Sequence, residues 1–282
     1  MQTLTSMKDR YTEVARRIAR AAERSGRSER DVLLVVVTKY TDPETILRLI
    51  ELGHQDFGES RVQQLAQRAA MAQEWLDRRQ TLPAVAAAHH ISRGLHDAAT
   101  GGPLRTPPEV RWHMIGRLQR NKAKKAVECA RLIHSVDSLR LGEELHAAAM
   151  RHDTVTDVLL QVNTSGEASK QGVAPPAARH VAEQIDTMVH LRLRGVMTMA
   201  PLSDDPEDAR PTFERAAELF DEIRSAGVAR GHFNILSMGM SRDFEVAIEC
   251  GANVVRIGSA VIGERDRNAT DDADDHDPPD DD

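Results

Sequence analysis

A lysine stands just past a run of apolar, mostly β-branched residues. The stretch from Leu33 to Ile46 reads LLVVVTKYTDPETI, and Lys39 follows a run that is typical of a strand buried on both faces. Asp42 and Pro43 then form a helix start, with the aspartate as cap and the proline at the first helical position. In its neutral form a lysine amine attacks a carbonyl and forms a Schiff base. The alternative at this stage is a loop lysine whose side chain extends into solvent.

Two later loops carry residues of the kind that bind an anion. The first is Ser237-Met-Gly-Met-Ser241 and the second is Arg256-Ile-Gly-Ser-Ala260, and each follows a short apolar run. Backbone amides beside glycine, serine hydroxyls and a helix start together suit a phosphate. Either loop alone is a weak signal, because helix caps use the same residues. Together with Lys39 they indicate a ligand that carries both a carbonyl and a phosphate.

The elements that would position these residues alternate between short apolar runs and helical patterns. The apolar runs are Val32–Val37, His54–Phe57, Val110–Ile115, Leu132–Val136, Val158–Val162, Leu191–Met197, Phe233–Ser237 and Asn253–Ile257. Helical patterns separate most of them, and one more helical pattern precedes the first run. This alternation predicts a parallel sheet, and eight units predict a single (β/α)8 TIM-type barrel with an extra N-terminal helix. The alternative is an open, doubly wound sheet.

A barrel would gather the chemistry at one end. Active sites of this fold lie at the C-terminal ends of the strands, and the last two loops recurrently bind phosphate. We therefore expect Lys39 to face the two serine-rich and glycine-containing loops across the barrel mouth. Pyridoxal 5′-phosphate (PLP), with an aldehyde at one end and a phosphate at the other, fits such a site.

Two segments depart from the alternation. We expect residues 1–263 to form the barrel, residues 79–109 to be a mobile insertion, and residues 264–282 to be a disordered acidic tail. The tail holds ten acidic and two basic residues, so the net charge of −7 belongs to the tail and the body is nearly neutral. His89 and His90 lie in the insertion without an evident third ligand, so no metal site is predicted.

Composition argues against several classes of partner. The nearly neutral body gives no reason to expect nucleic acid. No apolar run approaches the roughly 18 residues that a membrane helix needs. The first ten residues already include charges, which is not typical of a secretory signal. Cys129 and Cys250 stand alone, as reduced thiols do. We therefore expect a cytoplasmic protein.

Six stretches resemble the pyridoxal-phosphate homeostasis protein family, whose members look like the barrel domain of alanine racemase. The stretches are VVVTKY, FGES, WHMIGRLQRNK, VNTSGEASKQGV, RGVMTMAP and LSMGMSRDFEVAIECGANVVRIGSAVIG. They run from the first apolar run to Gly263, so the resemblance covers most of the chain.

The resemblance implies a role for each residue of the proposed site. It implies that Lys39 is the Schiff-base lysine and that Arg256 faces the pyridine nitrogen. It implies that the phosphate is held by a serine and glycine set, with two neighbours close by: Ser237, Gly258 and Ser259, with Met238 and Ser241. Ser60 stands where the family usually has asparagine after Phe-Gly-Glu, and that contact is carried over only weakly.

The same resemblance argues against a dedicated racemase. A guanidinium such as that of Arg256 donates a hydrogen bond to the ring nitrogen but does not readily give up a proton, so the ring is a poor electron sink. Racemases with such an arginine use two bases, a lysine and, by resemblance, a tyrosine from a second β-rich domain. Little chain follows the eighth apolar run, so we expect that domain to be absent. The two tyrosines are Tyr11, on the leading helix, and Tyr40, beside Lys39.

We therefore expect a monomeric, non-enzymatic PLP-binding protein for intracellular PLP homeostasis. It would hold PLP as a Schiff base on Lys39, limit the free aldehyde, and hand the cofactor to PLP-dependent apo-enzymes, without nucleic-acid or membrane partners. The first alternative is a weak PLP-dependent amino-acid racemase, and the second is a Schiff-base aldolase on a similar barrel without a cofactor. His113, in the third apolar run, either points into the barrel or packs as a hydrogen-bonded core histidine.

Overall fold

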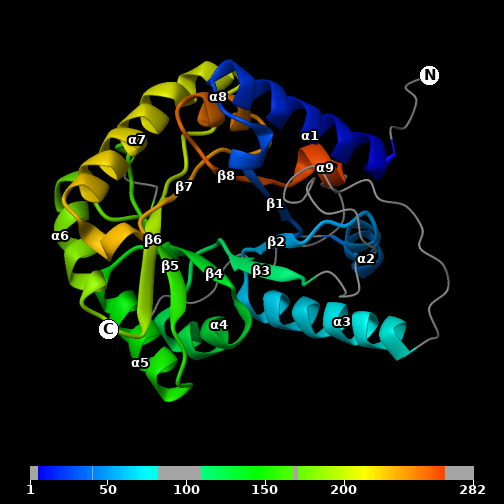
Figure 1. Cartoon of the computed structure of the whole chain (residues 1–282), viewed down its shortest axis with the longest axis horizontal. Helices are drawn as coiled ribbons and strands as arrows, with labels where there is room; N and C mark the ends of the chain where they lie inside the picture. Colours follow the sequence, from blue (N-terminus) through cyan, green and yellow to red (C-terminus); the bar gives the residue numbers. More distant parts are fainter. Residues whose placement is uncertain (1–5, 40, 82–108, 168–170, 264–282) are drawn as a thin grey trace.

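The protein is a closed barrel of eight parallel strands. The structure, a computed structural model, describes residues 6–39, 41–81, 109–167 and 171–263. Each strand pairs with the next, and β1 pairs with β8 to close the barrel (Figure 1). The strands are β1 (Leu33–Val37), β2 (Asp56–Glu59), β3 (Arg111–Met114), β4 (Leu132–Val136), β5 (Thr156–Gln161), β6 (Leu191–Met197), β7 (Ile235–Ser237) and β8 (Val254–Ile257). The (β/α)8 prediction is confirmed, and the open doubly wound sheet is excluded.

Helices surround the barrel on the outside (Figure 1). They are α1 (Met7–Arg24), α2 (Pro43–Glu51), α3 (Val62–Thr81), α4 (Ala123–Cys129), α5 (Leu139–Arg151), α6 (Pro175–Asp186), α7 (Arg210–Ser225), α8 (Phe244–Glu249) and α9 (Ser259–Ile262). Short 3-10 turns lie between some of them: η1 (Glu29–Asp31), η2 (Arg120–Lys122), η3 (Pro206–Ala209) and η4 (Val228–Gly231). In the described part of the chain no helix is long and apolar enough to cross a bilayer.

The extra N-terminal helix is present and packs on the last helices of the barrel. Ser6 caps α1 through a capping box with Asp9. The buried face of α1 contacts α8 and α9. Arg10 adds two hydrogen bonds, from Nε to the carbonyl of Val261 (3.0 Å) and from Nη2 to the carbonyl of Ile262 (2.5 Å). The helix therefore holds the segment that follows β8.

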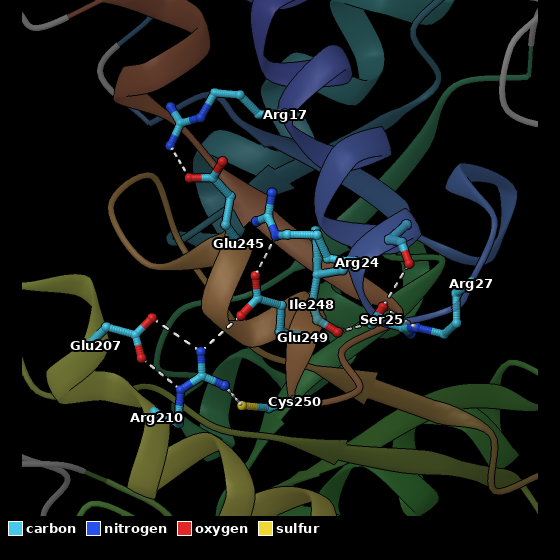
Figure 2. A network of polar contacts seen from close by, with 11 residues as sticks. Arg17, Arg24, Ser25, Arg27, Glu207, Arg210, Glu245, Ile248, Glu249 and Cys250 are labelled. Atoms are coloured by element: carbon cyan, nitrogen blue, oxygen red, sulfur yellow. Dashed lines mark hydrogen bonds and ion pairs between the residues drawn. The ribbon is translucent and has the colours of Figure 1, made fainter.

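Ion pairs reinforce the packing of α1 on α8, as Figure 2 shows. Arg17 contacts Glu245 at 2.6 Å and Arg24 contacts Glu249 at 2.8 Å. The other carboxylate oxygen of Glu249 accepts from Arg210, at the start of α7, at 2.8 Å. Three helices thus share one polar network.

Strand alternation divides the buried side chains between two regions. One face of each strand packs against the helices in the main core, where Val36, Phe57 and Trp112 lie. A separate small cluster of Leu132, Leu159 and Met197 comes from three neighbouring strands and belongs to the barrel interior. The interior of the barrel is the region that leads to the site.

Several predicted boundaries differ from the structure. β2 begins at Asp56 and ends at Glu59, two residues later at each end than the predicted run, and its last two residues, Gly58 and Glu59, are buried but not apolar. Helix α3 reaches Thr81, so the first residues of the expected insertion are helical. The rest of that insertion and the expected acidic tail, residues 82–108 and 264–282, lie outside the described residues.

Candidate functional site

Lys39 lies at the barrel mouth. β1 ends at Val37, Thr38 is buried, and Lys39 is exposed in the turn that follows. By alternation Lys39 continues the side of the strand to which Val35 and Val37 belong. Because β1 pairs with β8, the lysine lies beside the loop after β8 rather than across the barrel from it. This adjacency corrects the expected arrangement and brings the amine closer to that loop.

The loops after β7 and β8 are joined by the hydroxyl of Ser241. Its Oγ accepts hydrogen bonds from the amides of Gly258 (3.2 Å) and Ala260 (3.3 Å) at the start of α9. A Cβ on Gly258 would lie 3.3 Å from the carbonyl oxygen of Val37, so this turn is also close to β1. Ser259 is exposed beside it. Because the lone pairs of this hydroxyl accept from two amides, its proton is available to be donated to an anion.

Gly239 lets the loop after β7 lie tightly on α8. Its φ is +94°, and a Cβ there would lie 2.6 Å from the Cβ of Ala247. The side chain of neighbouring Met238 is buried in the main core, and its amide donates to the carbonyl of Val254 at 3.1 Å. Any contribution of Met238 to a ligand therefore comes from its backbone.

Arg256 and Ser237 form a deeper pair inside the barrel. The guanidinium of Arg256 donates from Nη1 to Ser237 Oγ (2.7 Å) and from Nη2 to the carbonyl of Thr198 (2.9 Å). Only 3% of Arg256 is exposed, and burial lowers its pKa to about 10. At neutral pH the group is still a cation that donates hydrogen bonds. Ser237 is therefore a neighbour of Arg256, below the turn that holds Ser241 and Gly258.

The end of β2 brings an acid that the sequence reasoning missed. Glu59 is fully buried, and its Oε1 accepts from Thr38 and Arg68. Burial raises the pKa of Glu59, and the hydrogen bond from Thr38 and the charges of Arg68 and Lys39 oppose that rise. Within the described residues, its Oε2 has no hydrogen-bond partner. The sequence signal that could have identified Glu59 was a charged residue at the end of an apolar run, in the stretch FGES.

Ser60 follows directly and lies against the loop after β3. A Cβ on Gly116 would be only 2.3 Å from the carbonyl oxygen of Ser60, so the two backbones touch. This contact places Ser60 at the strand ends, on the same side of the barrel as Lys39.

A chain of buried polar side chains crosses the barrel interior below Arg256. Ser237 Oγ lies 3.0 Å from His134 Nδ1, and His134 Nε2 lies 2.9 Å from His113 Nδ1. His113 Nε2 lies 3.0 Å from Asp56 Oδ1, and Arg111 holds both oxygens of Asp56. His113 thus points into the barrel and is hydrogen-bonded there. The polar residues inside the strand stretches LIHSV and DFGE were the signal for His134 and Asp56.

Burial sets the charge state along this chain. Burial, followed by the electrostatic effects of the neighbouring His113 and of the Arg256 guanidinium, lowers the pKa of His134 well below its usual value. Burial alone would raise the pKa of Asp56, but hydrogen bonds from His113 and Arg111 hold it below its usual value. The chain therefore runs from a buried cation to a buried carboxylate, with a neutral His134 between them.

Tyr11 lies at the opposite end of the barrel from Lys39. Its hydroxyl is 3.2 Å from Nδ1 of His54, which precedes β2. Burial and the charge of Asp56 raise the pKa of Tyr11 to about 12. Tyr11 is therefore placed away from the mouth, and Tyr40 lies outside the described residues. No cluster of three metal-binding side chains occurs among the residues that the structure describes.

The geometry at the mouth suits a ligand with three features. An exposed amine can bind a carbonyl, a serine hydroxyl held at the start of α9 can donate to an anion, and a buried guanidinium can donate to a ring acceptor. All three lie at the C-terminal ends of β1, β7 and β8.

Comparisons with known proteins show the family of this chain. The family model described as alanine racemase, N-terminal domain, matches residues 11–266. The pyridoxal phosphate homeostasis protein of Aquifex aeolicus is 37% identical over 258 residues, which cover 91% of this chain and 97% of that protein. A protein of the same name from Helicobacter pylori is 34% identical and covers 83% of this chain and 88% of its own length.

Solved structures give the same picture. An unknown protein from Bifidobacterium adolescentis superposes with a TM-score of 0.77 at 31% identity, over 90% of this chain and 94% of that chain. PipY of Synechococcus elongatus with PLP bound has a TM-score of 0.65 at 29% identity, over 89% of this chain and 100% of that chain. An alanine racemase of Clostridium difficile, at 13% identity, a TM-score of 0.62 and coverage of 94% of this chain and 58% of that chain, shows the fold alone.

Proposed function

Because the chain belongs to the pyridoxal phosphate homeostasis protein family, we propose that it binds PLP and serves intracellular PLP homeostasis. The observation that carries the proposal is the adjacency of Lys39 to the turn of Gly258 and Ser241, across the β1–β8 pair. The relatives' name and the PLP bound to PipY support it.

The residues present fit the group. When bound, PLP supplies an aldehyde that reacts reversibly with amines. Lys39 would hold it as a Schiff base, and the Ser241 hydroxyl, which already accepts from two amides, would donate its own proton to a phosphate oxygen. The proposed site consists of residues from the ends of four strands and the loops that follow: Lys39, Ser60, Ser237, Met238, Ser241, Arg256, Gly258 and Ser259.

Arg256 favours binding over turnover. Its guanidinium is a cation at neutral pH and donates hydrogen bonds, so it would orient the ring nitrogen without protonating it. A second base opposite the lysine is also needed for efficient racemisation, and the bond from Tyr11 to His54 keeps that tyrosine at the other end of the barrel. We therefore propose a non-enzymatic role.

The proposal extends to the protein's behaviour in the cell. The protein would act as a cytoplasmic monomer whose barrel, residues 1–263, is a single domain. It would limit free aldehyde and pass PLP to apo-enzymes. Neither nucleic acid nor membrane is part of this proposal.

Absorption spectra before and after borohydride, followed by peptide mapping, test the proposal. We expect the purified protein to take up PLP, to lose the absorption of the adduct on reduction, and to carry the label on Lys39. Lys39→Ala should abolish the label, and Lys124→Ala, on the exposed side of α4, should retain it.

Each contrary result has its own meaning. A label on another lysine would show that the site is assigned to the wrong residue. Failure to take up PLP would refute the function. Turnover of alanine at about 1 per second or more would replace the proposal by a racemase.

A further inference from the structure

The hydrogen-bonded chain inside the barrel has a direction that its two ends impose. Arg256 carries only donors at one end, and the ionised Asp56 carries only acceptors at the other. Arg256 donates to Ser237, so Ser237 can use its own proton toward His134. His134 then donates through Nε2 to His113, and His113 donates through Nε2 to Asp56. Every link is satisfied with both imidazoles neutral.

The opposite direction would require an additional proton. If His113 donated from Nδ1 to His134, it would still face the Asp56 carboxylate with Nε2 and would have to be protonated at both nitrogens. Arg111 already contacts both oxygens of Asp56, at 2.9 and 2.6 Å, and balances its charge. A second cation there would be buried without a free counter-charge, which is costly. The neutral chain is therefore the stable one.

This direction controls what Ser237 presents to Arg256. Because the Ser237 hydroxyl donates its proton to His134, its oxygen accepts from Nη1 of the guanidinium. The carbonyl of Thr198 accepts from Nη2. Two fixed acceptors define the plane of the guanidinium. A hydroxyl without this commitment could rotate, and its proton would then oppose the N–H of Arg256.

We propose that His134, His113 and Asp56 are positioning residues: through the Ser237 hydroxyl they fix the orientation in which Arg256 donates to the ring nitrogen of the bound ligand. The proposal rests on the proposed function, because PLP supplies that ring nitrogen. The three would act through Ser237 and Arg256 rather than on the ligand itself. Ser237 is thereby a link to the ring end of the ligand.

The imidazole tautomers of the protein without PLP are the first test. Long-range ¹H–¹⁵N correlation spectra, assigned with His113→Gln and His134→Gln, report which ring nitrogen carries the proton. We expect both rings to be neutral and protonated at Nε2. An Nδ1-protonated or doubly protonated ring at neutral pH would overturn the assigned direction. This measurement does not depend on PLP binding.

A pair of matched variants provides the second test. Asp56→Asn replaces the acceptor-only end by an amide that both donates and accepts, so either direction becomes possible with neutral rings. The control is Asp157→Asn. Asp157 is similarly buried at the start of β5, but it contacts Arg194 at 2.8 Å and is not part of the hydrogen-bonded chain from Arg256 to Asp56. Affinity is measured for PLP and for 1-deazapyridoxal 5′-phosphate, which has carbon in place of the ring nitrogen.

The expected pattern is specific to the ring nitrogen. Asp56→Asn should weaken PLP binding by about tenfold, the loss of one well-formed bond to a charged group, and should leave the deaza analogue nearly unaffected. Asp157→Asn should change neither. Equal weakening for both ligands, or identical behaviour of the two variants, would overturn the positioning role. If wild type binds neither ligand, the proposed function fails instead, and the tautomer result still decides the direction of the chain.

Discussion

The hydroxyl of Ser241 accepts a hydrogen bond from the amide of Gly258 at 3.2 Å, across the two last strand-end loops. The amide of Ala260 donates to the same oxygen at 3.3 Å. One side chain from the loop after β7 thus arranges the first turn of α9 after β8. Removing this hydroxyl should therefore weaken the binding of a ligand's phosphate group more than the binding of its aldehyde.

Ser241→Ala should therefore discriminate between phosphorylated and unphosphorylated ligands. We expect affinity for PLP to fall by about tenfold, the usual cost of a lost charge-assisted hydrogen bond, and affinity for pyridoxal to change little. Ser203→Ala is the control, because that hydroxyl bonds to two residues close to it in sequence, Asp205 and Asp208. Equal losses for PLP and pyridoxal would place the phosphate elsewhere. Titrations followed by absorbance give both affinities.

Gly239→Ala should destabilise the protein more than Gly227→Ala does. Both glycines have positive φ, at +94° and +79°, but a Cβ at position 239 would collide with Ala247 and Phe244, while position 227 is open. We expect about 1 kcal/mol for Gly227→Ala from φ strain alone, and about 3 kcal/mol for Gly239→Ala from strain and overpacking together. Urea denaturation measures both. Similar losses would mean that the loop after β7 relaxes away from α8.

Arg27→Ala should weaken the attachment of the N-terminal region to α8. Arg27 donates to the carbonyl of Ile248 at the end of α8, as Figure 2 shows, and to that of Ala252 at 2.9 Å. Removing a half-buried guanidinium that satisfies helix-end carbonyls should cost about 2 kcal/mol of unfolding free energy. Arg16→Ala, which removes a surface pair with Glu13, should have little effect. If both variants unfold alike, Arg27 does not anchor α8.

His54 should make the protein less stable as the pH falls. Burial lowers the pKa of His54 to about 4, whereas an unfolded histidine titrates near 6.5. Between these values the unfolded chain binds the proton and the folded chain does not, so the free energy of unfolding decreases with falling pH. His54→Gln should make the slope shallower by about 1.4 kcal/mol per pH unit between about pH 6 and 4.5. His134 adds a loss of the same sign in both proteins.

Denaturant titrations at several pH values measure that slope. His180→Gln, on the exposed face of α6, is the control for removing a histidine from the surface. If the free energy of unfolding of His54→Gln decreased with falling pH as steeply as that of wild type, the His54 ring would become charged inside the folded protein.

The barrel could be predicted from sequence where apolar residues mark both ends of a strand. The bounds of β4 and β6 agree with their runs, because Leu132 and Val136, and Leu191 and Met197, are the apolar ends of strands that contain polar residues. The bounds of β2 were missed, since Gly58 and Glu59 are buried through close packing and an ion pair rather than through apolar character. The four-residue helix α9 is too short to have a periodic pattern.

The site was predictable only as a set of residue types. Sequence indicated Lys39, the two loops and Arg256, but it could not tell that Ser237 lies beside Arg256 and Ser241 beside Gly258. Those partnerships depend on the stagger of neighbouring strands, which no local pattern encodes. The same holds for His134 and Asp56, which come from β4 and β2 and belong to one chain only after the barrel has closed.

The pairing of β1 with β8 has a consequence for how the protein is made. During synthesis from the N-terminus, Lys39 leaves the ribosome more than two hundred residues before Gly258 and Ser259. Until β8 is available, β1 has an open edge, and α1 lacks the carbonyls of Val261 and Ile262 that Arg10 contacts. The proposed ligand site lies where β1 and β8 meet, so it would be completed last. A nascent chain should therefore gain its ability to capture the aldehyde in a single step, when β1 and β8 pair.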